Sequence, residues 1–225
     1  MKGLFRRSSN YTFLVELCDS EETGPPMLAV YKPAEGESPL WDFPTGTLYR
    51  REVASYLVAK HLGWPRIPPT VVREEGPHGI GALQMYVAAE PDRHYLASGG
   101  EPADRWIEVA LFDVLTNNAD RKSGHCLTDG DGEVWVIDHG LTFHVDPKLR
   151  TVIWDFAGQP VPARLHVDLA RLAGSLTSGD LVVRLGELLS RRELAVLRRR
   201  LQAMLRPGWQ LPHPTSAWSV PWPPV

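Results

Sequence analysis

The residue pattern changes from strand-like to helix-like part-way along the chain, and this change constrains the fold more than any other feature of the sequence. Ahead of it, apolar runs bounded by turn residues are typical of antiparallel strands: 11–17, 27–33 and the two halves of 68–88. One segment between them has apolar residues at helical spacing, begins near Thr45 and ends at Gly63 and Pro65. The first part of the chain therefore predicts a small antiparallel sheet that carries one helix.

The second part of the chain predicts mainly helices around one hairpin. Apolar residues recur at helical spacing in three segments: 103–116, 163–176 and 181–205, the last with a break near Ser190. The hairpin covers 126–138 and has the turn signal DGDG at its tip. We expect an α+β fold in three parts: a sheet-rich lobe at 1–97, a helical lobe at 98–206, and a Pro- and Trp-rich tail at 207–225 that either packs irregularly or is flexible. Clefts between such lobes commonly bind ligands.

Charge and composition argue against several classes of partner. A formal net charge of -3 gives no general attraction to nucleic acid or to an anionic membrane. No segment approaches the ~18 apolar residues that span a bilayer, and the first residues lack the apolar region of a secretory signal. We therefore expect a cytoplasmic protein with no nucleic-acid partner and no stable membrane anchor. In that compartment Cys18 and Cys126 are expected to be reduced thiols.

Two aspartates mark the end of the predicted helix at 103–116. Asp113 lies within an otherwise apolar helical run, and Asp120 follows seven residues later in a polar loop. A carboxylate in a buried stripe is costly unless it is hydrogen-bonded or paired. Asp113 therefore either makes an ordinary contact between helix and loop or braces the loop that bears Asp120.

A third aspartate ends the predicted hairpin. Asp138 follows the apolar run VWVI and precedes His139 and Gly140, where the backbone can turn sharply. Taken alone, an aspartate at a strand end is usually only a turn residue. The position also suits Mg²⁺, which takes oxygen ligands and is commonly held by one or two carboxylates together with substrate phosphates.

The order of these residues resembles the catalytic core of the phosphatidylinositol 3- and 4-kinase superfamily. The shared pattern is an Asp seven residues before Asp-Arg, then a hairpin, then apolar-Ile-Asp-x-Gly. The resemblance is greatest to the type II phosphatidylinositol 4-kinases, with HipA-type and secretory-pathway protein kinases as cousins. It implies a two-lobed protein-kinase-like fold with ATP and Mg²⁺ in the cleft, Asp120 as the base or orienter for the acceptor hydroxyl, Asp138 as metal ligand, and Asp113 in support.

The same resemblance extends upstream and implies how the nucleotide is held. Lys32 in AVYKP would contact the phosphates, and Glu52 in the following helix would pair with Lys32. Backbone around Val87 would bind adenine. A loop formed by Ser8, Ser9 and Asn10 would bind the phosphates through backbone N–H groups and side chains. These assignments agree with what phosphoryl transfer asks of a protein, which is mainly positioning and neutralisation of negative charge.

Two positions depart from the superfamily. His125 stands five residues after Asp120, where an Asn usually binds the second metal position. Its imidazole could bind metal, contact phosphate as imidazolium, or simply pack. The segment AEGESPLWDFPTGT at 34–47 stands in place of the cysteine-rich insertion that anchors type II lipid kinases to membranes. We therefore expect the acceptor to be a protein side chain or a small hydroxylated metabolite rather than a lipid.

The sequence thus predicts an ATP- and Mg²⁺-dependent phosphotransferase that moves the γ-phosphate of ATP to a hydroxyl group, with Lys32 and Asp120 as its catalytic residues. Two alternatives stay open. One is a nucleotide-binding pseudokinase that regulates a protein partner, which the histidine at position 125 favours. The other is transfer of AMP, with the nucleotide inverted in the same cleft.

Overall fold

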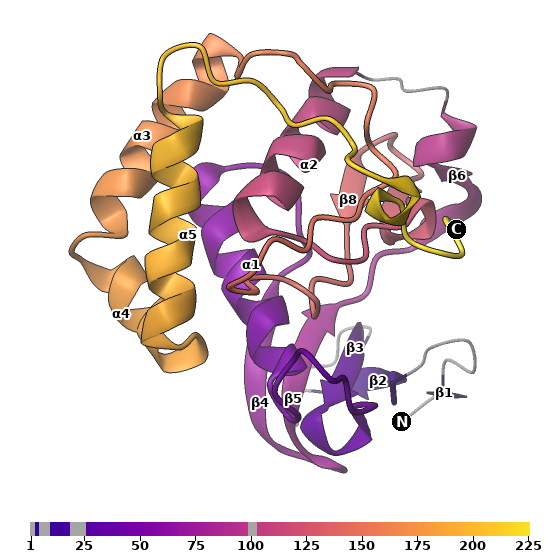
Figure 1. The fold of residues 1–225 in the computed structure, drawn as a ribbon. Helices are drawn as coiled ribbons and strands as arrows, with labels where there is room; N and C mark the ends of the chain where they lie inside the picture. The colour runs from indigo at the N-terminus through magenta and orange to yellow at the C-terminus, as the bar shows by residue number, and fades with distance from the viewer. Residues whose placement is uncertain (1–2, 5–9, 19–25, 99–102) are drawn as a thin grey trace.

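A five-stranded antiparallel sheet forms the first lobe. The computed structural model describes residues 3–4, 10–18, 26–98 and 103–225 (Figure 1). The sheet order is β1-β2-β3-β5-β4, and its strands are β1 (Gly3–Leu4), β2 (Phe13–Leu17), β3 (Met27–Pro33), β4 (Thr70–Gly76) and β5 (Gly79–Met85). The strands expected at 11–17, 27–33 and within 68–88 are confirmed. Apolar side chains alternate along β3 between buried and partly exposed positions, as expected for a strand with one face on a core.

One helix, α1 (Leu48–Leu62), packs against this sheet and contacts β4 and β5. Its first backbone N–H groups lack partners within the helix, and the Glu37 carboxylate accepts hydrogen bonds from two of them, Leu48 N at 2.9 Å and Tyr49 N at 3.1 Å. The helix ends at Gly63, whose φ of 88° is left-handed and whose N–H bonds to the Ala59 carbonyl. The predicted helix between Thr45 and Gly63 is therefore confirmed.

The second lobe is mainly helical and contains a three-stranded sheet of order β6-β7-β8. Its elements are β6 (Ala89–His94), α2 (Ala103–Thr116), β7 (Cys126–Asp129), β8 (Val134–Val136), α3 (Ala163–Ser175), α4 (Asp180–Leu188) and α5 (Arg191–Met204). Short 3-10 helices complete it: η2 (Tyr95–Ala97), η3 (Ser123–His125) and η4 (Ala217–Ser219), while η1 (Ala34–Gly36) lies in the first lobe. In Figure 1, α3, α4 and α5 lie together on one side of the molecule.

The break expected near Ser190 is the junction between α4 and α5. The Ser190 hydroxyl accepts a hydrogen bond from Glu193 N at 3.3 Å, and the Glu193 carboxylate accepts one from Ser190 N at 2.7 Å. This reciprocal pair is a capping box, which starts a new helix and explains why one periodic run becomes two elements.

Strand β6 was not expected from its sequence. Its residues AEPDRH are polar and include a proline, so they have little strand propensity. The strand exists because β7 pairs with it, with Ala89 opposite Asp129 and His94 opposite Leu127 in an irregular register. It precedes residue 97, the expected end of the first lobe, yet its sheet partner belongs to the second part of the chain.

The two lobes share one continuous apolar core, which includes Val53 and Val58 of α1 together with Trp106 and Phe112 of α2. A buried guanidinium also links the two lobes. Arg51 of α1 donates to the Thr142 carbonyl at 2.8 Å and forms an ion pair with Glu193 of α5 at 2.5 Å. Helix α1 is therefore anchored to both lobes.

The Pro- and Trp-rich tail packs irregularly on the second lobe, which was one of the two expected outcomes. Backbone hydrogen bonds hold it at three points: Leu211 N to Gln159 O at 2.9 Å, Thr151 N to Ser219 O at 3.0 Å, and Ser123 N to Pro224 O at 2.8 Å.

Cys18 and Cys126 both carry free thiols. Among the described helices, none has the length and apolar character needed to cross a bilayer.

Candidate active site

A cavity of about 640 Å³ opens between the two lobes, and most of the residues expected in a nucleotide site line it. Its acidic, lysine and histidine lining residues come from distant parts of the sequence: Lys32, Glu52, Asp120, His125 and Asp138. Asn10 and Val87 also line it. Ser8 and Ser9 lie outside the residues that the structure describes.

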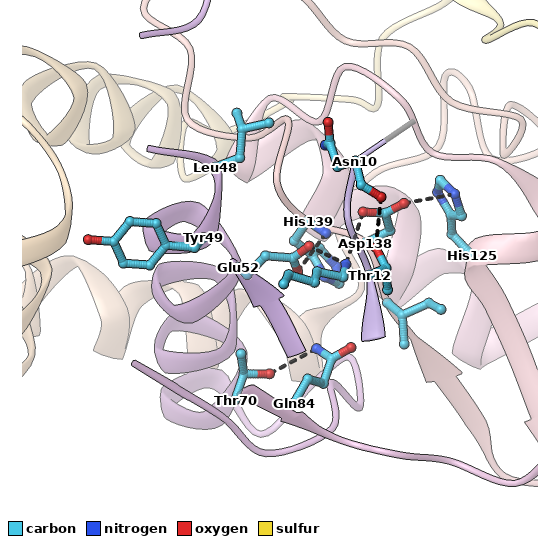
Figure 2. A network of polar contacts seen from close by, with 12 residues as sticks. Asn10, Thr12, Leu48, Tyr49, Glu52, Thr70, Gln84, His125, Asp138 and His139 are labelled. Atoms are coloured by element: carbon cyan, nitrogen blue, oxygen red, sulfur yellow. Dashed lines mark hydrogen bonds and ion pairs between the residues drawn. The ribbon is translucent and has the colours of Figure 1, made fainter. Parts of the chain in front are cut away.

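The Lys32 ammonium is the centre of an ionic cluster at the back of this cleft. Its Nζ lies 2.5 Å from Glu52 Oε1 and 3.1 Å from Asp138 Oδ1. The second oxygen of Glu52 accepts a hydrogen bond from His139 N at 2.9 Å. The Glu52 carboxylate on α1 thus contacts both the β3 lysine and the backbone just after Asp138. Figure 2 shows Glu52 beside His139 and Asp138.

The backbone conformation of Asp138 aims its carboxylate into the cleft. Its φ is 60°, in the left-handed region that few residues other than Gly, Asn and Asp tolerate. The preceding residue is fixed by a hydrogen bond from Ile137 N to the His125 carbonyl at 2.9 Å. Strained conformations of this kind persist where the surrounding structure enforces them and are frequent at functional sites.

Mutual attraction fixes the charge states in this cluster. Burial alone would lower the pKa of Lys32, but the carboxylates of Asp138 and Glu52 raise it above its ordinary value. Burial would raise the pKa of Asp138, but the Lys32 ammonium holds it well below its usual range. Lys32 is therefore a cation and Asp138 an anion at neutral pH.

The loop that bears Asp120 is braced by buried polar contacts. Asp113 accepts hydrogen bonds from Asn118 Nδ2 at 2.9 Å and from Arg121 Nε at 3.1 Å. Asn118 Oδ1 in turn accepts from Asp120 N at 3.0 Å. Thr151 Oγ1 also donates to Asp113, at 3.3 Å. Of the two interpretations of Asp113, these contacts match the one in which it supports the Asp120 loop.

Asp120 itself faces the cleft and keeps part of its side chain exposed. Its Oδ2 lies 3.5 Å from Lys122 Nζ. Burial raises the pKa of Asp120 to about 6, against the opposing effect of Lys122. A carboxylate whose pKa is raised toward neutrality is a better proton acceptor than an exposed aspartate, while still being largely ionised at pH 7.

His125 lines the cleft next to Asp138. Its Nε2 is 3.2 Å from Asp138 Oδ2, and a dashed line joins the two residues in Figure 2. Burial lowers the pKa of His125 to about 4, so the ring is neutral at pH 7.

Apolar side chains line the part of the cleft where adenine is expected, around Val87. They come from both lobes: Val30, Met85, Tyr86, Val87, Leu127 and Ile137. The Asn10 carboxamide accepts a hydrogen bond from Ser38 N at 2.7 Å, which fixes one rim of the cleft. Apolar lining beside a charged cluster suits a ligand with an aromatic base at one end and anionic groups at the other.

A protein of Mycobacterium tuberculosis, Rv2133c, is 40% identical to this chain over 98% of its length and 90% of that protein. The chain belongs to the Rv2133c family. Matches to plant kinases are weaker. The phosphatidylinositol 4-kinase gamma 2 of Arabidopsis thaliana is 25% identical over 74% of the chain, and the gamma 4 enzyme of Oryza sativa is 26% identical over 49%. The aligned regions span only 32% and 23% of those kinases.

Solved structures establish the fold of this member of the Rv2133c family. The proinflammatory kinase CtkA of Helicobacter pylori superposes with a TM-score of 0.51 at 12% identity over 90% of both chains. Fam20 of hydra superposes with a TM-score of 0.50 at 17% identity over 88% of this chain and 82% of its own. The expected α+β, two-lobed, kinase-like fold is therefore confirmed. No family model matches the chain.

Two residues at the cleft were not expected from the sequence. Gln84 lines the cleft and donates to the buried Thr70 hydroxyl at 2.8 Å, and Lys122 contacts Asp120. Lys122 could have been expected, because a lysine two positions after Asp120 in the sequence is close enough to contact its carboxylate. Only the pairing of β4 with β5 places Gln84 opposite Thr70, so sequence alone held no signal for that contact.

The donor atoms of Asp138 and His125 suit a divalent cation that is shared with a ligand. Within the described ranges, no group of three or more His, Cys, Asp or Glu side chains could hold a metal ion by itself. Asp138 and His125 offer an oxygen and a nitrogen close together. Oxygens of a bound polyphosphate would have to complete the coordination, as is common for nucleotide-bound Mg²⁺.

Proposed function

We propose that this protein is an ATP-dependent phosphotransferase that moves the γ-phosphate of ATP to a hydroxyl group of a protein or a small metabolite. One observation carries the proposal: Lys32, Asp120 and Asp138 converge on one cleft of a kinase-like fold. Each is the residue type that phosphoryl transfer needs, namely a fixed cation, a proton acceptor and a metal-binding carboxylate.

The residues divide the chemical work among them. Lys32, held by Glu52 and Asp138, would neutralise phosphate oxygens at the back of the cleft. Asp120 would orient the acceptor hydroxyl and take its proton as the new oxygen–phosphorus bond forms and the bond from the γ-phosphorus to the bridging oxygen breaks, which releases ADP. A divalent cation, expected to be Mg²⁺, would neutralise charge on the phosphates when bound by Asp138 and His125.

The similar proteins support a phosphotransferase but do not identify its acceptor substrate. The plant relatives are phosphatidylinositol 4-kinases by name, and CtkA is described as a kinase. A lipid acceptor is less favoured, because the segment at 34–47 contains no cysteine and is tied to the second lobe: Phe43 is buried against the His144 ring, and Asp42 pairs with Lys148 at 2.8 Å. Leu40 and Trp41 of the same segment are exposed. That segment offers no membrane-anchoring insertion.

Nucleotide binding is the first expected result. ATP with a divalent cation at about a hundred times its Kd should stabilise the folded chain by about 2.7 kcal/mol, or about 5–10 °C in Tm, because it binds only the folded state. Lys32→Ala should weaken ATP binding, since the phosphates would then face Glu52 without a compensating cation. Differential scanning fluorimetry and titration calorimetry measure both effects.

Lys60→Ala is the matched control, because Lys60 is exposed on α1 and does not line the cleft. It should leave ATP affinity unchanged. Absence of any ATP-induced shift in the parent chain would contradict both the phosphotransferase and the pseudokinase. Unchanged affinity in Lys32→Ala would show that β3 does not carry the phosphate-binding lysine.

A further inference from the structure

The Pro- and Trp-rich tail at 207–225 contacts the loop that bears Asp120. In Figure 1 the tail, drawn in yellow, runs from α5 across the second lobe and ends near β6. The Pro224 carbonyl accepts a hydrogen bond from Ser123 N at 2.8 Å. Ser123 has 0% exposure, and the next residue, Gly124, lines the cleft. The tail therefore holds the part of the loop that follows Asp120.

A second contact from the tail reaches the loop through one intervening segment. The Ser219 carbonyl accepts a hydrogen bond from Thr151 N at 3.0 Å. Thr151 lies beside Arg121 in a parallel bridge. The carbonyl before Thr151 accepts from Arg121 N at 3.0 Å, and the N–H after Thr151 donates to Arg121 O at 3.1 Å. The tail thus supports the loop on both sides of Lys122.

The tail is attached through its backbone and not by burial of its largest side chains. Trp218 and Trp222 are 78% and 89% exposed, whereas Ser219 between them is buried. The Ser219 hydroxyl accepts hydrogen bonds from Thr215 N at 3.1 Å and from Ser216 N at 3.3 Å, which fixes the turn that presents the Ser219 carbonyl. Backbone contacts and exposed side chains can therefore be tested separately.

We propose that the tail is a positioning element for phosphoryl transfer, whose carbonyls at Ser219 and Pro224 fix the loop so that Asp120 is aligned with the acceptor hydroxyl. The inference rests on the proposed function, which assigns Asp120 as proton acceptor. The Asp113 contacts brace the loop ahead of Asp120, and the tail braces the part after it. A buried N–H that loses its partner must find another or move to water, so loss of Pro224 would shift the loop at Ser123.

The test deletes residues 222–225, which removes the Pro224 carbonyl. Transfer of label from γ-labelled ATP to the acceptors of a cell extract should fall by about 10²-fold, the effect that a misplacement of about 1 Å can have. The Kd for ATP with Mg²⁺ should stay that of the parent chain, because the tail's backbone contacts do not involve Lys32 or Asp138. In the Asp120→Asn background the same deletion should lower transfer no further, because the group that the tail positions is already absent.

Trp218→Ala is the matched control, since it removes an exposed side chain of the tail and keeps the backbone contacts, and it should retain the parent turnover. Amide hydrogen exchange followed by mass spectrometry should show faster exchange around Ser123 in the deletion variant and unchanged exchange in α1. If the Tm shows that the deletion variant is unfolded, Ser219→Ala replaces it and should lower turnover with unchanged ATP affinity.

The outcomes separate this inference from the proposed function. Parent-like turnover in the folded variant, or unchanged exchange around Ser123, would overturn the role of the tail while the phosphotransferase stood. An equal fall in the parent and Asp120→Asn backgrounds would also overturn it, because the tail would then not act through Asp120. Absence of transfer by a parent chain that binds ATP would overturn the proposed function and this inference together.

Discussion

Asp120→Asn is expected to lower the rate of phosphoryl transfer by about 10² to 10⁴-fold, the usual contribution of a general base. The substitution keeps the side-chain shape but removes the proton acceptor and its negative charge. ATP affinity should change little, because Lys32 and Asp138, not Asp120, form the ionic cluster at the back of the cleft. Turnover is measured as ADP release, and affinity is measured by calorimetry, on the same preparations.

The control is Asp131→Asn, which makes the same chemical change at the exposed tip of the β7–β8 hairpin and should retain full turnover. Asp138→Asn should behave differently from both. It removes a carboxylate ligand, so metal-dependent nucleotide binding should weaken along with turnover. If Asp120→Asn lost metal-dependent binding while Asp138→Asn kept both properties, the two roles would be reversed.

Asp113→Ala is expected to destabilise the fold by about 3–5 kcal/mol, because it leaves a fully buried guanidinium without its anion. Both side chains of the Asp113–Arg121 pair have 0% exposure, and their closest atoms are 3.1 Å apart. The remaining Arg121 contacts, to the Ile137 carbonyl and to His139, are with uncharged groups. The free energy of unfolding is obtained from urea denaturation followed by tryptophan fluorescence.

Glu133→Ala provides the matched comparison, since it breaks the ion pair with Arg66, which has the same 3.1 Å separation but side chains that are 49% and 38% exposed. Surface pairs contribute about 0–1 kcal/mol, so its effect should be small. Similar losses of unfolding free energy in the two variants would show that burial does not determine how much the Asp113 contact stabilises the fold.

Site residues that lie close together in the sequence could be predicted. Asp113, Asp120 and Asp138 fall within one stretch of chain, and the turn signal DGDG between them indicated the hairpin that brings Asp138 back toward the loop. Most helices and strands also followed from periodicity, because their apolar faces pack on the core that the lobes share or on a smaller cluster between β2 and β3. The pairing of Lys32 with Glu52, by contrast, came from the resemblance to kinases and not from spacing.

Contacts between distant segments could not be predicted from one sequence. Arg51 and Glu193 are both charged residues on helices, and nothing local marks them as partners across the lobes. Strand β6 has a polar sequence and owes its existence to β7. The orientation of His125 depends on the backbone carbonyl of Asp120 and on the Asp138 carboxylate, which are not its neighbours in sequence, so the sequence left three roles open for its imidazole.

Transfer of label from ATP tests the central claim most directly. The chain is incubated with a cell extract and ATP labelled on the γ-phosphate, and in parallel with ATP labelled on the α-phosphate, followed by separation of proteins, lipids and small molecules. The account predicts label from the γ-position only, in protein or small-molecule acceptors, and none above background with Asp120→Asn. Label from the α-position, transfer undiminished in Asp120→Asn, or no transfer from either position would contradict it.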